Sequence, residues 1–112
     1  MIVTLLTDLR LATKYITFYG VIKNIRSKAL RLYYEKDDGS KLPASNLYKI
    51  KLIIGLLDAA KEPEDMNFPG SGLHKLSGNK NDFWSVKVSG NYHIIFKFEN
   101  GHAYDIDYLD YH

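Results

Sequence analysis

The residues of this 112-residue chain that could do proton-transfer chemistry gather toward its C-terminal end. Lys87, His93 and Asp107 supply a cation, a titratable ring and a carboxylate, and the chain closes on the polar triplet Asp110-Tyr111-His112. A histidine, with an unperturbed pKa of about 6.5, can donate or accept a proton near neutrality. The question is whether the fold places these groups on one surface.

The elements that carry these residues are predicted to be three consecutive antiparallel strands. Apolar residues alternate with polar ones in two runs, namely Trp84, Val86 and Val88, then Tyr92, Ile94, Phe96 and Phe98. This period of two is typical of half-buried strands. The apolar sets meet on one face only if paired residue numbers sum to an even number. We therefore expect three-residue loops at Ser89-Gly90-Asn91 and Glu99-Asn100-Gly101, and exclude two-residue loops at both places.

This register fixes the cross-strand neighbours. The expected core pairs are Trp84 with Phe96, Val86 with Ile94, Phe96 with Tyr104, Ile94 with Ile106, and Tyr92 with Tyr108. The three tyrosines and Trp84 are accordingly read as packing residues. On the polar face, Lys87, His93 and Asp107 form one row across three strands. The competing interpretation is an ordinary solvated sheet face.

Length and composition indicate one domain of ordinary type. Hydrophobic residues make up 46% and charged residues 25%, and the net charge is +2. A polyanion would therefore have to bind a local patch, and the segment from Lys75 to Lys97 has four lysines and one acid, Asp82. The absence of cysteine removes disulfides and thiolate chemistry and suits a reducing cytoplasm. The four histidines lack an HxxxH spacing, so no metal site is expected.

Residues 1–20 admit two interpretations. Asp8, Arg10 and Lys14 interrupt their apolar run, which excludes a secretory signal and a membrane span. They could form an additional edge strand or short helix. Alternatively the natural domain begins at Val21, with residues 1–20 as an N-terminal extension upstream of the natural start and residues 21–112 as the folded domain.

Two helices are expected before the strands. After a short strand at Val21 to Ile25, Ser27 is a plausible N-cap for a helix that ends at Asp38-Gly39-Ser40. Ser45 is the expected cap of a second helix, which Pro63 terminates. Its apolar stripe comprises Leu47, Ile50, Ile53, Ile54 and Leu57. The predicted fold class is α+β, a two-helix hairpin packed on a small, mostly antiparallel sheet, to which Leu73–Leu76 could add an edge strand.

Several short motifs resemble one toxin family. They are Leu73-His74-Lys75-Leu76, Phe83 to Val88, Asn91-Tyr92, Phe96, Gly101, Ala103-Tyr104-Asp105 and the terminal Asp110-Tyr111-His112. Together they resemble the HigB toxins of the RelE/ParE superfamily, over roughly residues 21–112. The resemblance implies a compact α+β toxin that cleaves mRNA on the ribosome in the cytoplasm. It also implies a helix-turn-helix antitoxin of the HigA type as partner, and no cofactor, metal or membrane.

The resemblance also carries over functional residues. His74, Asp110, Tyr111 and His112 match the catalytic positions, where two histidines could divide the acid and base roles. Lys75, Lys80, Lys87 and His93 are the expected RNA and phosphate contacts. Ser77 and His93 stand where many members carry lysine and arginine, which leaves a catalytically weakened member as one alternative. The other alternative is a non-catalytic toxin of the ParE type, which binds DNA gyrase.

Overall fold

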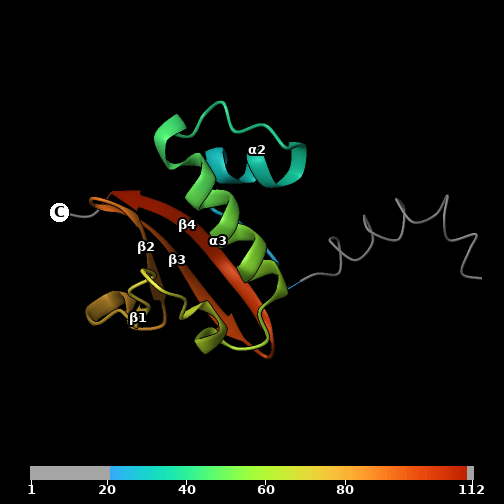
Figure 1. Ribbon diagram of the computed structural model, residues 1–112. Helices are drawn as coiled ribbons and strands as arrows, with labels where there is room; N and C mark the ends of the chain where they lie inside the picture. Colours follow the sequence, from blue (N-terminus) through green and yellow to red (C-terminus); the bar gives the residue numbers. More distant parts are fainter. Residues whose placement is uncertain (1–20, 111–112) are drawn as a thin grey trace, which may run out of the picture.

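The computed structural model describes residues 21–110, and residues 1–20 and 111–112 lie outside the described part. Two α-helices lie against one face of a four-stranded antiparallel sheet with strand order β1-β2-β3-β4 (Figure 1). The elements are α2 (Lys28–Lys36), a 3-10 turn (Ala44–Asn46), α3 (Leu47–Ala59), a 3-10 turn (Pro63–Met66), β1 (His74–Lys75), a 3-10 turn (Gly78–Lys80), β2 (Trp84–Ser89), β3 (Tyr92–Glu99) and β4 (His102–Asp110). This α+β architecture confirms the predicted fold class.

Local signals explain where the helices begin and end. Ser27 Oγ accepts the Leu30 N–H, which confirms the first predicted N-cap, and Asp37 ends α2 with φ +54°. The predicted cap at Ser45 is wrong. Ser45 lies inside the 3-10 turn, and α3 starts at Leu47, with Asn46 at the N-cap position and no side-chain cap. The 3-10 turn that follows Pro43 leads directly into α3 at the position where the cap was expected.

The core lies between α3 and the sheet. Ile50, Ile53, Ile54 and Leu57 are buried, as the sequence stripe predicts, and the apolar side chains of the sheet lie across from them. Asp58 ties the helical layer together, because its Oδ1 accepts both the Tyr34 hydroxyl at 3.0 Å and the Ile22 N–H at 3.3 Å. That half-buried carboxylate links α2, α3 and the N-terminal segment.

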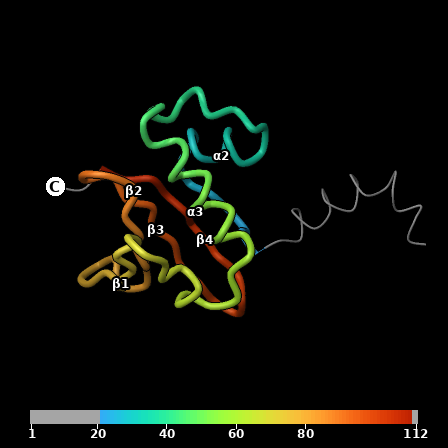
Figure 2. The backbone as a smooth tube through the Cα atoms, viewed as in Figure 1, coloured from blue at the N-terminus to red at the C-terminus, as the bar shows by residue number. Residues whose placement is uncertain are grey.

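The predicted strand at Val21 to Ile25 is present only as two parallel bridges to β4. Ile22 pairs with Ala103, and Ile25 pairs with Ile106. Figure 2 shows this segment, in blue, running beside β4, in red, before the chain turns into α2. Both isoleucines are buried, so the segment closes the core along the β4 edge.

The first hairpin combines a correct register with a wrong loop. Trp84 pairs with Phe96 and Lys87 pairs with His93, as predicted. Near the turn Ser89 pairs with Tyr92, so that Gly90 and Asn91 form the two-residue loop excluded above. A β-bulge between Lys87 and Ser89 adds the extra residue that parity requires. Val88 nevertheless remains buried.

The second hairpin also corrects the sequence prediction. Glu99 pairs with His102 across a two-residue turn whose central residues, Asn100 and Gly101, have φ +53° and +79°, as a type I′ turn requires. A bulge opposite Phe96 then shifts the register of β4. Its residue Asp105 has φ +51°.

The bulge makes all three expected core pairs between β3 and β4 wrong. Phe96 does not pair with Tyr104, Ile94 lies opposite Tyr108 instead of Ile106, and Tyr92 lies opposite Asp110 instead of Tyr108. Tyr104 now lies opposite Lys97, so the prediction of Tyr104 as a core residue is wrong. Asp107 lies opposite Ile95 and Leu109 lies opposite His93, so the predicted row of Lys87, His93 and Asp107 is broken at its third member. Tyr92, Tyr108 and Trp84 do pack against the core, as predicted.

Candidate active site

The face of the sheet turned away from the helices, called the outer face below, collects most of the polar candidates. Because Val86, Ile94 and Phe96 point into the core, their strand neighbours point outward. Directly opposed residues share a face, which places β1 there through His74 opposite Ser85. The described outer-face residues include His74, Ser85, Lys87, His93, Ile95, Lys97, Asp107 and Leu109.

His74 is exposed on the short edge strand β1. Two backbone bonds fix this strand, Lys87 N–H to the Ser71 carbonyl at 2.8 Å and Leu76 N–H to the Phe83 carbonyl at 2.9 Å. Nδ1 of the His74 ring lies 2.9 Å from the Gly72 carbonyl oxygen. A carbonyl only accepts, so Nδ1 carries the proton, and in the neutral ring Nε2 has the lone pair.

Lys87 and His93 are direct cross-strand neighbours on the outer face. Lys87 is exposed and His93 is half-buried. His93 Nδ1 lies 3.0 Å from the Asn91 carbonyl, so this ring is held in the same way as His74. The expected third member of the row, Asp107, instead accepts the Tyr108 N–H at 2.9 Å.

Ser85 is a buried polar residue on this side of the sheet that the sequence analysis did not single out. It is fully buried in β2 between His74 and Ile95, and among the described residues its hydroxyl has no hydrogen-bond partner. A buried, unsatisfied hydroxyl is uncommon because it loses its bond to water. The only sequence signal is a small polar residue interrupting the strand run 83–88.

Lys80 belongs to a cation cluster around Phe83. The ring of Phe83 is buried, with the Lys80, Lys97 and Arg26 cations at 5.6, 5.2 and 5.8 Å from its centroid. These distances are within the range of cation–π attraction. No sequence signal joins Arg26 to Phe83, because the two residues are far apart in the chain and meet only when the N-terminal segment lies along β4.

Asp105 neutralises part of this cluster. Its Oδ2 lies 3.3 Å from Arg26 and 3.6 Å from Lys97, while Asn24 donates to its Oδ1 at 2.8 Å. The Asn24 hydrogen bond, followed by the nearby Arg26 and Lys97 charges, lowers the pKa of Asp105.

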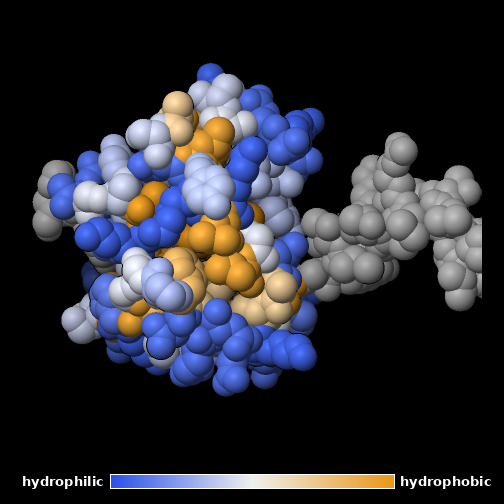
Figure 3. All heavy atoms as spheres, in the orientation of Figure 1, coloured by the Kyte–Doolittle hydropathy of each residue, from blue (hydrophilic) through white to orange (hydrophobic). Residues whose placement is uncertain are grey.

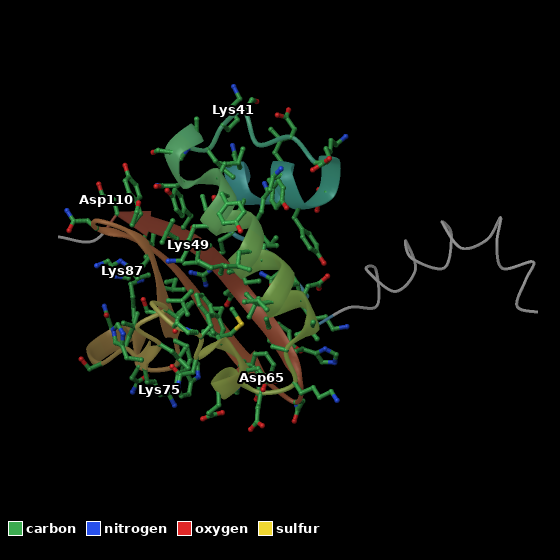
Figure 4. The ribbon with its side chains drawn as sticks, viewed as in Figure 1. Lys41, Lys49, Asp65, Lys75, Lys87 and Asp110 are labelled. Atoms are coloured by element: carbon green, nitrogen blue, oxygen red, sulfur yellow. The ribbon has the colours of Figure 1, made fainter. Side chains whose placement is uncertain are left out.

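The Lys75 side chain lies on the opposite face of the sheet from His74, its neighbour in sequence. It lies opposite Trp84, and its ammonium is 5.7 Å from the Trp84 ring centroid, on the core-facing side of the sheet. Figure 4 shows Lys75 at the lower left of the view, with Lys87 above it. The expected phosphate contacts are therefore divided among different surfaces.

Asp110 ends β4 opposite Tyr92 and is exposed. Tyr92 and Tyr108 stack beside it with centroids 5.2 Å apart. Buried Asn46 donates to the Tyr108 hydroxyl at 2.8 Å and accepts from the Ser89 hydroxyl at 2.5 Å, which joins the start of α3 to this end of the sheet. These contacts hold the end of β4, where Asp110 lies, against the rest of the sheet and the start of α3.

His74 and Asp110 lie on β1 and β4, the two edge strands of the sheet, whose axes are three strand spacings or about 14 Å apart. The register aligns His74 with Asp107, so Asp110 is also displaced along the strand direction. Figure 4 shows Asp110 near the chain end, above Lys87. The structure does not bring His74 and Asp110 into contact. The other two predicted catalytic residues, Tyr111 and His112, lie outside the described residues.

Residues 21–110 contain no group of three or more His, Cys, Asp or Glu side chains arranged to hold a metal ion. No helix within this range combines the length and apolar character needed to cross a membrane. The outer face presents the His74 and His93 rings and the Lys87 ammonium group.

Comparison with known proteins identifies the family. Residues 23–112 match the model of a family described as RelE-like toxin of type II toxin-antitoxin system HigB. A Proteus vulgaris relative named Endoribonuclease HigB is 37% identical over 92 residues, or 82% of this chain and 100% of that protein. A Vibrio cholerae relative named Toxin HigB-1 is 33% identical over 78% of this chain and 93% of its own. An uncharacterized Haemophilus influenzae protein is 36% identical over 73% and 81%. On this match the chain belongs to the RelE-like HigB toxins of type II toxin–antitoxin systems.

Proposed function

We propose that this protein is an endoribonuclease toxin that cuts mRNA on the ribosome, in the cytoplasm. The proposal is supported by family membership and by the Proteus vulgaris relative, whose name states endoribonuclease activity and whose whole length aligns. The antitoxin partner that the family implies would be a helix-turn-helix protein of the HigA type. Residues 21–112 would form the toxin domain and residues 1–20 an N-terminal extension.

The observation that carries the proposal is the arrangement of His74 with Lys87 and His93 on the outer face. The His74 ring is exposed, and its Nδ1–H is held by the Gly72 carbonyl at 2.9 Å, which directs the basic lone pair to Nε2. A base with a fixed tautomer beside an ammonium group suits a reaction on a phosphodiester.

In the proposed reaction, Nε2 of His74 takes the proton from a ribose 2′-hydroxyl. The 2′-oxygen attacks the adjacent phosphorus, and the bond from phosphorus to the 5′-oxygen breaks to leave a 2′,3′-cyclic phosphate. His112 returns a proton to the departing 5′-oxygen, so the proton count balances without a metal or cofactor. The Lys87 ammonium, with His93 beside it, offsets the charge on the phosphoryl oxygens.

The chain end would complete the site. The chain has two more residues after Asp110, and two residues reach at most about 7 Å, so Tyr111 and His112 would act near the end of β4. Asp110 would orient the His112 imidazole, and Tyr111 would stack on an unpaired base. Lys80, and Lys75 at the sheet margin, would contact RNA phosphates further from the cut.

The test compares His74→Gln and His112→Gln with wild type in a translation reaction, mapping new 5′ ends on the message. Loss of a general acid or base should lower the cleavage rate by about 10² to 10⁴-fold. The matched control is His102→Gln, because His102 packs edge-on against Tyr104 near the β3–β4 turn. Its cleavage rate should stay within a few-fold of wild type.

A parallel reaction without ribosomes should show little cleavage by the wild-type protein. If His74→Gln and His112→Gln still arrest growth while messages remain intact, the endonuclease proposal fails. Inhibition of DNA gyrase by those same variants would then support the ParE-type alternative.

A further inference from the structure

Helix α3 is apolar on two opposite sides. One side, Ile50, Ile53, Ile54 and Leu57, is buried against the sheet. The other side, called the outer seam below, faces solvent and comprises Tyr48, Leu52, Gly55, Leu56 and Ala59. Positions 48, 52, 55 and 59 are separated by four, three and four residues, a spacing that keeps side chains on one face of a helix. Figure 3 shows the resulting apolar patch over α3.

The exposure of the outer seam is large. Tyr48 is 82% exposed, Leu52 42% and Leu56 36%, and these are the large hydrophobic residues that the described chain leaves most open. Single exposed apolar residues are common on soluble proteins. An aligned set is different, because a surface helix ordinarily carries polar residues on the side opposite its buried stripe.

Gly55 provides an independent observation. It has an ordinary helical backbone, and a Cβ built on it would meet no atom within 4 Å. Glycine in a helix interior is unfavourable relative to alanine, and here no neighbour within the described chain requires it. A missing side chain in the middle of an exposed apolar seam lets a second backbone approach closely.

The charges beside the outer seam indicate the kind of partner. Lys49 and Lys51 flank it on either side, and Figure 4 shows Lys49 on the visible face of α3. The acid of α3, Asp58, already accepts from Tyr34 and from the Ile22 backbone. The border contributed by α3 is therefore cationic, which complements a segment with acidic flanks.

We propose that the outer seam is the docking surface for the antitoxin, and that it receives an apolar helix face of that protein flanked by Asp or Glu residues. The occupant follows from family membership, which supplies a protein partner, and from the cationic border. The inference rests on the toxin–antitoxin part of the proposed function and not on RNA cleavage. Small residues on the antitoxin helix would pack against Gly55, with Tyr48 and Leu52 on either side of the contact.

The test measures the affinity of the full 112-residue toxin for its operon-encoded antitoxin, purified from co-expression. The double variant Leu52→Gln/Leu56→Gln should bind at least tenfold more weakly than wild type. The matched control is Leu109→Gln on the outer face, which should bind within about twofold of wild type. Circular dichroism checks that each variant is folded.

Gly55→Ala keeps the experiment decisive if the double variant does not fold. The substitution should raise the melting temperature of the free toxin by about 3–6 °C, because alanine favours the helix. It should nevertheless weaken antitoxin binding at least tenfold, because the added methyl group blocks close approach. A merely structural role for Gly55 predicts a higher melting temperature with unchanged binding.

Two results would overturn the proposal. One is wild-type affinity in both the double variant and Gly55→Ala. The other is a wild-type toxin that is dimeric by light scattering and becomes monomeric in these variants without loss of antitoxin binding, which would assign the seam to a second copy of the chain. Cleavage assays keep the two proposals separate, since seam variants should cut mRNA as wild type does and His74→Gln should still bind antitoxin.

Discussion

At the scale of single residues, Asp105 organises one end of the outer face. It adopts φ +51° in the β4 bulge, and Asn24 bonds both to its carboxylate and to its backbone N–H. The same carboxylate pairs with Arg26 and Lys97. Aspartate tolerates the left-handed backbone region better than most residues, so one side chain serves the bulge and the cation cluster together.

The pH dependence of stability should report on Asp105. Its pKa in the folded protein lies below the ordinary value of 3.8, chiefly through the Asn24 bond. The stabilisation is therefore fully present above that ordinary value and is lost as the pH falls through the folded-state pKa. Asp105→Asn should lower the free energy of unfolding at pH 7 by about 1 kcal/mol or less, as for a largely solvated ion pair.

Urea unfolding at a series of pH values measures this difference. The difference in free energy of unfolding between wild type and Asp105→Asn should become smaller as the pH falls from 5 to 3. The control Asp82→Asn changes an exposed acid, and its free energy of unfolding should stay close to that of wild type over the same range. A gap that stays constant over this range would show that the Asp105 charge contributes nothing.

At the scale of elements, Asn46 connects the helical layer to the end of the sheet that carries the chain terminus. Its amide bonds both to Tyr108 in β4 and to Ser89 in β2, and the residue is 5% exposed. Removing a buried hydrogen-bonding group leaves its partners unsatisfied. The start of α3 therefore depends on this link rather than on a cap.

Asn46→Ala should lower the free energy of unfolding by about 1–3 kcal/mol, since two partners lose their bonds. Ser45→Ala is the matched control, and its exposed position predicts a change within about 0.5 kcal/mol. Chemical denaturation of both variants makes the comparison. A cost of 1 kcal/mol or more for Ser45→Ala would mean that the cap expected from sequence operates in solution.

Sequence reasoning succeeded for elements whose signals are local. The Ser27 cap, the α3 stripe and the pairing of Lys87 with His93 follow from nearby residues. It failed at the two bulges. A bulge adds one residue to a strand, so between it and the turn the paired residue numbers no longer sum to an even number. The β4 bulge is held by Asn24, about eighty positions away in sequence. The Phe83 cation cluster was missed for the same reason.

At the scale of the whole molecule, the two proposals assign different tasks to the two layers. The outer face of the sheet presents His74, Lys87 and His93, while the outer seam of α3 faces away from the other layer. The net charge of +2 gives little general attraction for RNA, so local groups must supply it. The sequence identified the catalytic candidates through family resemblance, whereas the separation of His74 from Asp110 follows only from strand order.

The family match spans residues 23–112 and leaves residues 1–20 outside it, which leads to a prediction about the domain. A chain that starts at position 21, with Val21→Met as initiator, should unfold with a free energy within about 0.5 kcal/mol of the full chain. The short chain should also cleave mRNA at the same rate as the full chain. Thermal and urea unfolding of both chains measure this. A markedly less stable short chain would show that residues 1–20 belong to the folded unit.

The pairing of Ile22 and Ile25 with β4 affects how separate molecules of this toxin meet. A bare strand edge recruits strands from other molecules, and here the segment of 21–26 covers β4 as far as Ile106. At the opposite edge β1 is only two residues long. The described sheet therefore offers other copies of the toxin little template for edge-to-edge aggregation.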